Sequence, residues 1–345
     1  MSTTKAFDFF IQWHLTERCN LRCRHCYQEG RSFQELSLSE ILGTIEEVAE
    51  MITAWSDSYG LSFSPSFTVT GGEPFLRADL FDILEAMKQK GFELFLLSNG
   101  VLIDRDKADR LSQLGVKGVQ VSLEGPKEIH ETIRGAGSFS ASLEGIGHLV
   151  ATGIPVTVNM TLSKLNGESV FPMIKLAKNL GVQRLGFSRL VPSGRGMALG
   201  DEILSREEIR DLYRRIFPQE VEGLQIVTGD PLASQLSEPE VKEDLGKIPL
   251  AGCAAGFSGL TLLPDGTVLP CRRMPVSIGN VKKDSLRELW VTSPVLEDLR
   301  NKHKYQGRCG QCKRWAVCRG CRAIACALSE GRNNYLAEDP HCFLA

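Results

Sequence analysis

Three cysteines that lie close together give the strongest chemical signal in the sequence. The stretch CNLRCRHC places Cys19, Cys23 and Cys26 within eight residues, and the next cysteine is Cys253. Structural zinc sites usually have four protein ligands. Three thiolates at this spacing can instead hold three irons of a cuboidal four-iron cluster and leave the fourth iron open. The alternative is that a distant cysteine completes a structural cluster or zinc site.

The loop that carries these cysteines follows the first of six predicted strands. The six segments are short and apolar or β-branched: Phe9–Leu15, Phe67–Thr70, Leu94–Ser98, Val119–Leu123, Val156–Thr161 and Leu185–Leu190. Amphipathic patterns between them predict helices, after the capping box Ser37-Leu-Ser-Glu40 and at Leu80–Lys90, Ala108–Leu114, Ser142–Ala151 and Val170–Leu180. These β-then-α units predict an α/β fold with a parallel sheet, but they are too few for a closed eight-stranded barrel. We therefore expect a partial (β/α)6 barrel of the TIM type, followed by a small cysteine-rich domain.

Polar residues stand at the ends of the next four predicted strands. They are Gly71-Gly72-Glu73 after the second strand, Ser98 after the third, Ser122 and Glu124 after the fourth, and Asn159 in the fifth. Each pattern alone is typical of a turn. Because ligands of such folds bind at the carboxyl ends of the strands, the set predicts a pocket with polar and charged walls.

Eight further cysteines lie in the last quarter of the chain: Cys253, Cys271, Cys309, Cys312, Cys318, Cys321, Cys326 and Cys342. Two C-x2-C pairs among them could form a zinc ribbon. In a chain that already has a cluster-binding loop, further iron–sulfur clusters are the better interpretation. The segregation of the cysteines predicts a barrel at 1–218, a bridging segment at 219–250 and a cysteine-rich domain at 251–345.

The composition argues against several classes of partner. The net charge is −2, so the whole chain does not match nucleic acid or an anionic membrane. No apolar run approaches the ~18–20 residues of a transmembrane helix. Basic residues around Trp315 are better explained by neutralisation of negative clusters than by binding of nucleic acid. Since no secretion signal precedes them, the eleven cysteines indicate metal ligation in the reducing cytoplasm.

The C-x3-C-x2-C loop, the GGEP sequence and the Ser122/Glu124 pair together resemble the radical S-adenosylmethionine (radical SAM) enzymes, over roughly residues 9–200. The resemblance implies that Cys19, Cys23 and Cys26 ligate a [4Fe-4S] cluster and that S-adenosylmethionine chelates its open iron. Reduction of the cluster then yields a 5′-deoxyadenosyl radical, which abstracts hydrogen from a substrate.

The same resemblance implies contacts with S-adenosylmethionine. His25 would pack on the adenine, although a neutral loop histidine and a fourth cluster ligand are alternatives. The other implied contacts are Gly71, Gly72 and Glu73 at the methionine amino group, Ser122, Glu124 and Arg134 at the ribose and carboxylate, and Ser98, Asn159, Leu190 and Val191 around the nucleoside.

The tail resembles the SPASM extension of radical SAM enzymes, with a shortened C-x2-C at Cys318–Cys321. The resemblance implies two auxiliary [4Fe-4S] clusters, for about twelve irons in all. The outer set of ligands would be Cys309, Cys312, Cys318 and Cys342, and the inner set Cys253, Cys271 and Cys321. Either Cys326 is the fourth ligand of the inner cluster, or that cluster has one iron without a protein ligand.

Our leading hypothesis is an enzyme that modifies a ribosomal peptide or a protein residue. One alternative is oxidative modification or decarboxylation of a tetrapyrrole side chain, and another is a non-catalytic electron-transfer protein. A flavodoxin or ferredoxin is the expected electron donor. Only eighteen residues precede Cys19, so we expect a peptide substrate to be recognised by the barrel, by the tail or by a separate leader-binding protein. Asp230 is a candidate acid or base, but capping of a turn before proline is favoured.

Overall fold

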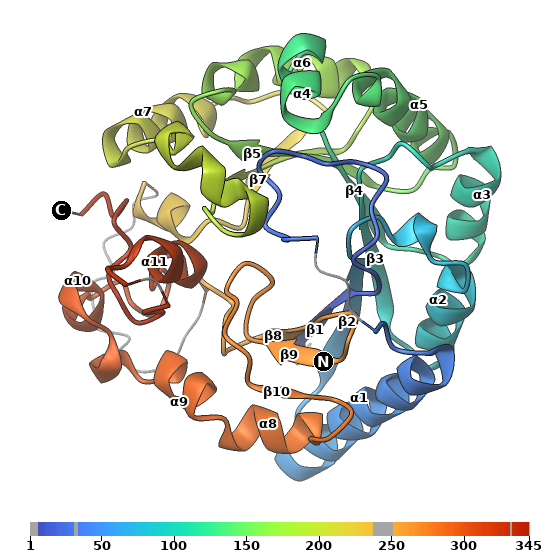
Figure 1. Ribbon diagram of the computed structural model, residues 1–345, viewed down its shortest axis with the longest axis vertical. Helices are drawn as coiled ribbons and strands as arrows, with labels where there is room; N and C mark the ends of the chain where they lie inside the picture. The colour runs from blue at the N-terminus through green and yellow to red at the C-terminus, as the bar shows by residue number, and fades with distance from the viewer. Residues whose placement is uncertain (1–5, 31–33, 237–250, 332, 345) are drawn as a thin grey trace, which may run out of the picture.

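Ten strands form one curved sheet at the centre of the molecule (Figure 1). They are β1 (Phe7–His14), β2 (Phe63–Thr70), β3 (Glu93–Ser98), β4 (Gly118–Ser122), β5 (Val156–Leu162), β6 (Arg184–Arg189), β7 (Gln225–Thr228), β8 (Gly259–Leu262), β9 (Thr267–Leu269) and β10 (Gly279–Asn280). Their order is β10-β9-β8-β1-β2-β3-β4-β5-β6-β7. The computed structural model describes residues 6–30, 34–236, 251–331 and 333–344.

The six predicted strands are confirmed as β1 to β6, and all are parallel to their neighbours. Within the described residues, the end strands β7 and β10 do not pair with each other, so the barrel is open. Parallel neighbours bring their carboxyl ends to one edge. That edge carries the three-cysteine loop.

Seven helices cover the outside of the barrel: α1 (Leu38–Tyr59), α2 (Leu80–Gln89), α3 (Arg105–Gln113), α4 (Lys127–Arg134), α5 (Ser138–Ala151), α6 (Val170–Asn179) and α7 (Arg206–Ile216) (Figure 1). The capping box predicted before α1 is present, because Ser37 N donates to Glu40 Oε2 at 2.7 Å and Glu40 N donates to Ser37 Oγ at 3.3 Å. The helix ends at Gly60 in the left-handed region. Its apolar face is buried, as the 3.6-residue spacing predicts.

Two features of the sheet differ from the predicted organisation. The segment interpreted as a bridge, 219–250, contains β7, which adds a seventh parallel strand beside β6. Residues 237–250 of that segment lie outside the described residues. The hairpin of β8 and β9 does not form a separate sheet, because β8 pairs in parallel with β1. The cysteine-rich region therefore shares its sheet with the barrel.

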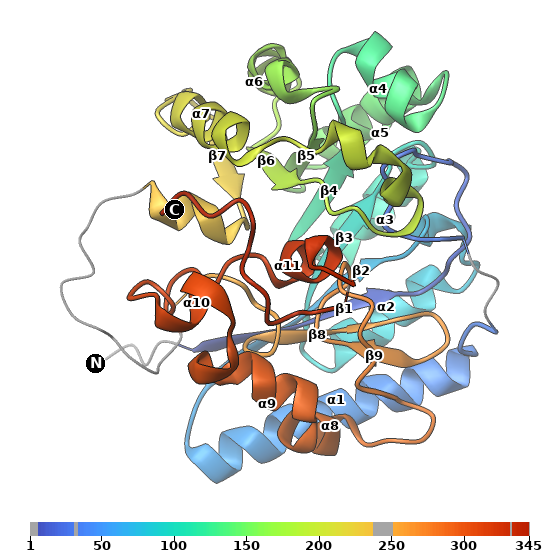
Figure 2. The same cartoon turned by 60° about the vertical axis from the view of Figure 1, so that its left-hand side comes forward.

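The rest of the tail lies at the opening of the barrel. Helices α8 (Leu286–Thr292) and α9 (Pro294–Arg300) continue the outer ring beside α1, and α10 (Gly307–Gln311) and α11 (Arg322–Leu328) lie between α9 and α7 (Figure 1). Figure 2 shows α10 and α11 beside the open side of the sheet. Among the described helices, none combines the length and apolarity that a membrane span requires.

The pairing of β8 with β1 depends on Gly259. A Cβ atom at this position would lie 2.3 Å from the carbonyl oxygen of Phe10, so any side chain must push the two strands apart. We expect Gly259→Ala to lower the free energy of unfolding by about 2–3 kcal/mol. Gly43→Ala on the exposed face of α1 meets nothing within 4 Å and is the control; it should raise stability by about 1 kcal/mol. Equal unfolding midpoints for the two variants would contradict this account.

Candidate functional site

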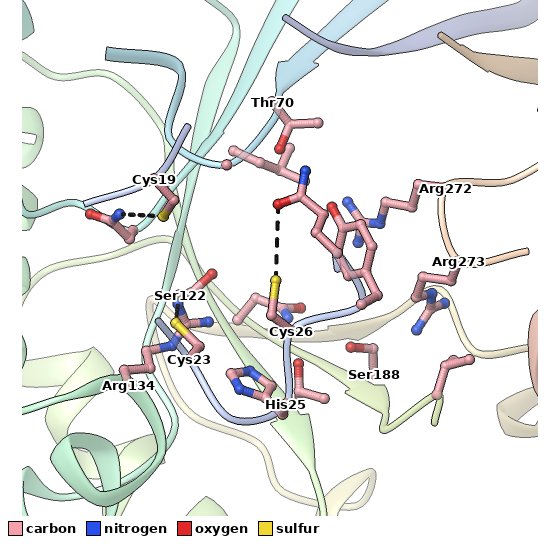
Figure 3. A pocket seen from close by; sticks show the side chains of 18 of the residues that line it. Cys19, Cys23, His25, Cys26, Thr70, Ser122, Arg134, Ser188, Arg272 and Arg273 are labelled. Carbon is pink, nitrogen blue, oxygen red and sulfur yellow. Dashed lines mark hydrogen bonds between the residues drawn. The ribbon is translucent and has the colours of Figure 1, made fainter. Parts of the chain in front are cut away.

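The three predicted cluster ligands lie together at the carboxyl edge of the barrel. Cys19, Cys23 and Cys26 line one cavity of about 130 Å³. Figure 3 shows their sulfur atoms facing the same space. The loop is fastened to the barrel by backbone hydrogen bonds, from Gly72 N to Thr16 O at 2.7 Å and from Glu73 N to Arg18 O at 2.8 Å. The thiol positions thus follow from the ends of β1 and β2.

The electrostatic surroundings of the three thiols suit a bound metal cluster. Burial raises the pKa of Cys19 to about 11, so its thiolate needs a compensating positive charge. Arg134 Nη1 lies 3.7 Å from Cys23 Sγ, and Arg195 Nε donates to Cys23 O at 3.2 Å. Cationic groups close to the loop offset the negative charge of a thiolate-ligated cluster. The residues present therefore fit a cluster of this kind.

The two glycines of GGEP allow the second loop to lie directly on the first. A Cβ atom at Gly71 would be 2.4 Å from Thr16 O, and one at Gly72 would be 2.2 Å from Arg18 O. Both glycines line the cavity. Because glycine has no Cβ atom, only glycine permits this close approach of the GGEP loop to the cysteine loop.

Glu73 does not line the cavity, in contrast to the two glycines before it. It is fully buried, and its carboxylate accepts hydrogen bonds from Ser98 Oγ at 2.9 Å and Asn99 N at 2.9 Å. Burial raises the pKa of Glu73 to about 7 despite these hydrogen bonds. The Glu73 side chain therefore joins the ends of β2 and β3 without lining the cavity. Ser98 itself does line the cavity.

Glu124 also lies outside the cavity lining, where it binds two other predicted site residues, His25 and Arg134. His25 Nε2 lies 3.0 Å from Glu124 Oε1, and Arg134 donates to the same oxygen through Nε at 2.9 Å and Nη2 at 2.6 Å. Burial alone would raise the pKa of Glu124, but His25 and Arg134 hold it well below its usual range. The carboxylate thus positions two residues, His25 and Arg134, that line the cavity.

The remaining predicted contacts reach the same cavity. It is lined by Ser122, Asn159, Leu190 and Val191. Ser122 and Asn159 are directly paired in the parallel register of β4 and β5. Gly186 on β6 leaves room for Asn159, because a Cβ atom there would lie 2.9 Å from Asn159 Oδ1. Their roles toward S-adenosylmethionine remain predictions.

Sequence reasoning missed several residues that complete the cavity. Arg272 and Arg273, from the loop after β9, lie across the cavity from Cys19 and Cys23 (Figure 3). Arg195 and Tyr27 also line it. The adjacent arginines after Cys271 were visible in the sequence, but no local pattern indicated that β8 would bring them over the barrel.

A second cavity of about 270 Å³ continues from the first. Both are lined by Gln120, Asn159, Ser188, Arg189, Arg272 and Arg273. The far end of the second cavity is lined by the inner set Cys253, Cys271 and Cys321. We call this continuous space the chamber. It joins the three-cysteine loop to the inner set.

The outer set lines a separate cavity. Cys309, Cys312, Cys318 and Cys342 surround a space of about 270 Å³. In the described ranges, no group of three or more His, Cys, Asp or Glu side chains is arranged to hold a single metal ion. A cuboidal cluster would occupy a space between its ligands, and the outer set lines such a space. Cys326 is buried on α11 and is not among the residues that line the chamber or this cavity, so its role remains a prediction.

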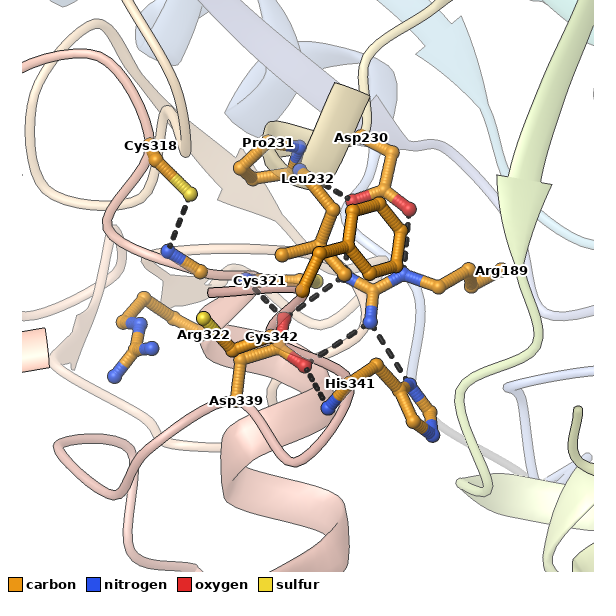
Figure 4. A network of polar contacts seen from close by, with 12 residues as sticks. Arg189, Asp230, Pro231, Leu232, Cys318, Cys321, Arg322, Asp339, His341 and Cys342 are labelled. Atoms are coloured by element: carbon orange, nitrogen blue, oxygen red, sulfur yellow. Dashed lines mark hydrogen bonds and ion pairs between the residues drawn. The ribbon is translucent and has the colours of Figure 1, made fainter. Parts of the chain in front are cut away.

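Asp230 belongs to a buried ionic network that joins the barrel to the tail (Figure 4). Arg189, at the end of β6, donates through Nη2 to Asp230 Oδ1 and to Asp339 Oδ2, each at 2.8 Å. Asp230 also caps the short helix η4 (Pro231–Gln235) by accepting from Leu232 N at 3.1 Å. The favoured interpretation, capping before proline, is confirmed. The Asp230 carboxylate therefore already accepts hydrogen bonds from Arg189 and Leu232.

Comparisons with known proteins agree with the site geometry. Residues 13–177 match the model of the Radical SAM superfamily, and residues 253–322 match SPASM, an iron-sulfur cluster-binding domain. The AdoMet-dependent heme synthase of Methanosarcina barkeri is 32% identical over 96% of this chain and 95% of that protein. The PqqA peptide cyclase of Gluconobacter oxydans is 28% identical over 96% of this chain and 89% of that protein.

Solved structures share the fold. The crystal structure of Streptococcus suis SuiB bound to precursor peptide SuiA has a TM-score of 0.74 at 14% identity. The match covers 98% of this chain and 76% of that chain.

The separation of the cysteine groups predicts that their clusters assemble independently. The triple change of Cys19, Cys23 and Cys26 to Ala should remove about four irons per chain and abolish cleavage of S-adenosylmethionine. The visible absorption of the tail's clusters should remain. Iron analysis after anaerobic reconstitution measures this directly. Loss of all iron from the triple variant would show that the sites are not independent.

Arg134 is predicted to be required for its geometry and not only for its charge. Arg134→Lys keeps a cation but cannot donate to Glu124 twice while also reaching Cys23. We expect a loss of about 10- to 100-fold in 5′-deoxyadenosine formation, equal to about 1.5–3 kcal/mol. Arg110→Lys, which alters an arginine stacked on Phe81 far from the thiols, is the control. Wild-type rates in both variants would exclude this role.

Proposed function

The chain belongs to the radical SAM superfamily and carries a SPASM domain, and we propose that its substrate is an acidic tetrapyrrole whose propionate side chain is oxidatively decarboxylated. It is an enzyme that binds S-adenosylmethionine, a [4Fe-4S] cluster and iron–sulfur clusters in its SPASM domain. We propose that Cys19, Cys23 and Cys26 ligate the [4Fe-4S] cluster at which S-adenosylmethionine binds. Bound at the three-cysteine loop, S-adenosylmethionine supplies the 5′-deoxyadenosyl radical. The substrate class is the proposal.

One observation supports an acidic substrate above the others. Arg272 and Arg273 face the chamber, and within the described residues neither forms a salt bridge with a carboxylate. Arg273 Nε is buried without a hydrogen-bond partner, and the Arg272 guanidinium lies 5.6 Å from the Tyr27 ring centroid. Burial lowers the pKa of Arg272, and the nearby Tyr27 and Cys271 offset this only in part. Burial would also lower the pKa of Arg273, but Cys321, Cys271 and Asp230 raise it.

Guanidinium groups bind carboxylates in a bidentate manner, so a pair of them matches a substrate with more than one carboxylate. The nearby Asp230 cannot serve as their partner, because Arg189 and Tyr213 already bind its oxygens. The two arginines lie between the three-cysteine loop and the inner set. A propionate held by them would present its carbon chain toward the S-adenosylmethionine side of the chamber.

The proposed reaction balances with the groups at hand. The propionate loses one hydrogen atom from the carbon next to the ring, then CO₂ and one electron, and a vinyl group remains. The hydrogen atom goes to the 5′-deoxyadenosyl radical. The electron requires an acceptor, which an iron–sulfur cluster held by the inner set at the end of the chamber would supply. Of the chain's own residues, Arg272 and Arg273 would bind the carboxylate.

A peptide or protein substrate is the second candidate. It is supported by similarity to the PqqA peptide cyclase and by the fold shared with SuiB, which was solved with a precursor peptide. The chamber also contains the amide side chains of Gln12, Gln120 and Asn159, which can pair with a peptide backbone. Gln12 Nε2 is buried without a partner.

Two further parts of the proposal concern the surroundings of the enzyme. We propose a flavodoxin or ferredoxin as electron donor, because reductive cleavage of S-adenosylmethionine needs a low-potential electron. We also propose that the enzyme works in the cytoplasm, since eleven reduced cysteines require a reducing compartment.

The arginine pair provides the test of the substrate class. The double variant Arg272→Gln/Arg273→Gln should raise KM for an iron-bound propionate tetrapyrrole by about 10- to 100-fold. The slow, substrate-independent formation of 5′-deoxyadenosine should continue, because the cysteine loop is untouched. Arg287→Gln, an exposed arginine on α8, is the control. Mass spectrometry should detect loss of CO₂ and two hydrogen atoms per side chain.

The same assay distinguishes the two candidates. Decarboxylated tetrapyrrole from the wild type, lost in the double variant and kept in the control, supports the acidic substrate. A modified peptide and an unchanged tetrapyrrole, with 5′-deoxyadenosine formed in both mixtures, would overturn it in favour of the peptide.

A further inference from the structure

We propose that Gln235 is a positioning residue that sets the reduction potential of the outer auxiliary cluster. Gln235 is the last residue of η4, which precedes the tail in sequence and which no motif connects with the cysteines. Its Nε2 lies 3.3 Å from Cys318 Sγ and 3.6 Å from Cys342 Sγ. One amide group therefore reaches two of the four sulfurs in the outer set.

The orientation of the Gln235 amide is fixed by the backbone of the tail. Phe343 N donates to Gln235 Oε1 at 2.8 Å, which fixes the oxygen at the backbone and the nitrogen toward Cys318. Cys342 Sγ lies 3.6 Å from Nε2 and 3.8 Å from Oε1, so the nitrogen is the nearer of the two amide atoms to this sulfur. A thiolate bound to iron can only accept hydrogen bonds. The NH₂ group has two hydrogens to donate, one for each sulfur, so its hydrogen-bonding capacity matches the two thiolates.

The inner set has no comparable donors. In the outer set, Cys318 Sγ also accepts from Gly320 N at 3.4 Å, and Arg322 Nη2 lies 3.7 Å from Cys309 Sγ. Within the described residues, no donor forms a hydrogen bond to a sulfur of Cys253, Cys271 or Cys321. Hydrogen bonds to cluster sulfurs stabilise the more negative, reduced state and raise the reduction potential. The donors thus act selectively on the outer cluster.

Gln235 is held in place by the same network that joins the barrel to the tail. Asp230 caps the start of η4, and Arg189 fixes Asp230 from the end of β6. The five-residue helix then delivers Gln235 to the outer cavity, which it lines. A glutamine positioned from both ends has little freedom to adopt other rotamers.

The test compares three variants and one control. All are made in a parent protein in which Cys19, Cys23 and Cys26 are changed to Ala, so that only the tail's clusters contribute to the signal. Midpoint potentials are measured by redox titration followed by electron paramagnetic resonance, without S-adenosylmethionine or substrate. Gln235→Leu removes both donors. Gln235→Glu keeps the shape and the acceptor for Phe343 N but replaces the NH₂ group with an anionic oxygen. Cys342→Ser identifies which signal belongs to the outer cluster.

We expect the outer potential to become more negative in Gln235→Leu and more negative still in Gln235→Glu, while the inner potential stays constant. Gln311→Leu is the matched control, since Gln311 is an exposed glutamine that lines the same cavity without a hydrogen bond to a sulfur. Its potentials should equal those of the parent. The proposal is overturned by an unchanged outer potential, by equal shifts at both clusters, or by an equal shift in Gln311→Leu.

The inference assumes the outer ligand set and does not depend on the substrate. Iron analysis of the parent protein reports separately whether the tail holds its clusters. A failed substrate assay would leave the potentials, and hence this test, unaffected.

Discussion

The buried guanidinium of Arg189 is the interaction on which the relation between barrel and tail depends. Its side chain is 2% exposed and is paired with Asp230 and Asp339, which are almost equally buried. Burial would raise the pKa of Asp339, but Arg189 lowers it to about 2. Removing one partner of such a group leaves an uncompensated buried charge, which costs about 3–5 kcal/mol. The network therefore specifies one arrangement of β6, η4 and the C-terminal segment.

That arrangement determines what surrounds the reacting groups. Arg189 O accepts from Arg273 Nη1 at 3.3 Å, and Asp339 Oδ2 accepts from Cys321 N at 2.8 Å. One ionic centre thus orients an arginine of the chamber and a cysteine of the inner set. The proposed substrate binding and electron removal would require these groups at fixed separations. The buried ionic network around Arg189 meets that requirement.

Sequence patterns predicted the features that depend on residues close together in the chain. The capping box at Ser37, the strands β1 to β6 and the three-cysteine loop follow from spacing over a few residues, and the structure confirms them. The pairing of β8 with β1, the placement of Arg272 and the contact of Gln235 with Cys318 depend on residues far apart in the chain. No periodicity encodes such contacts. Glu73 and Glu124 lie at the strand ends where the sequence placed them, but their burial outside the cavity depends on partners from neighbouring strands.

The position of β8 has a consequence for how the protein is made. β1 begins at Phe7, and its second neighbour in the sheet begins at Gly259. During synthesis one edge of β1 must therefore stay unpaired until most of the chain has left the ribosome. Unpaired apolar edges favour association with other chains, and distant pairings form slowly. Completion of this edge of the barrel is thereby coupled to synthesis of the tail.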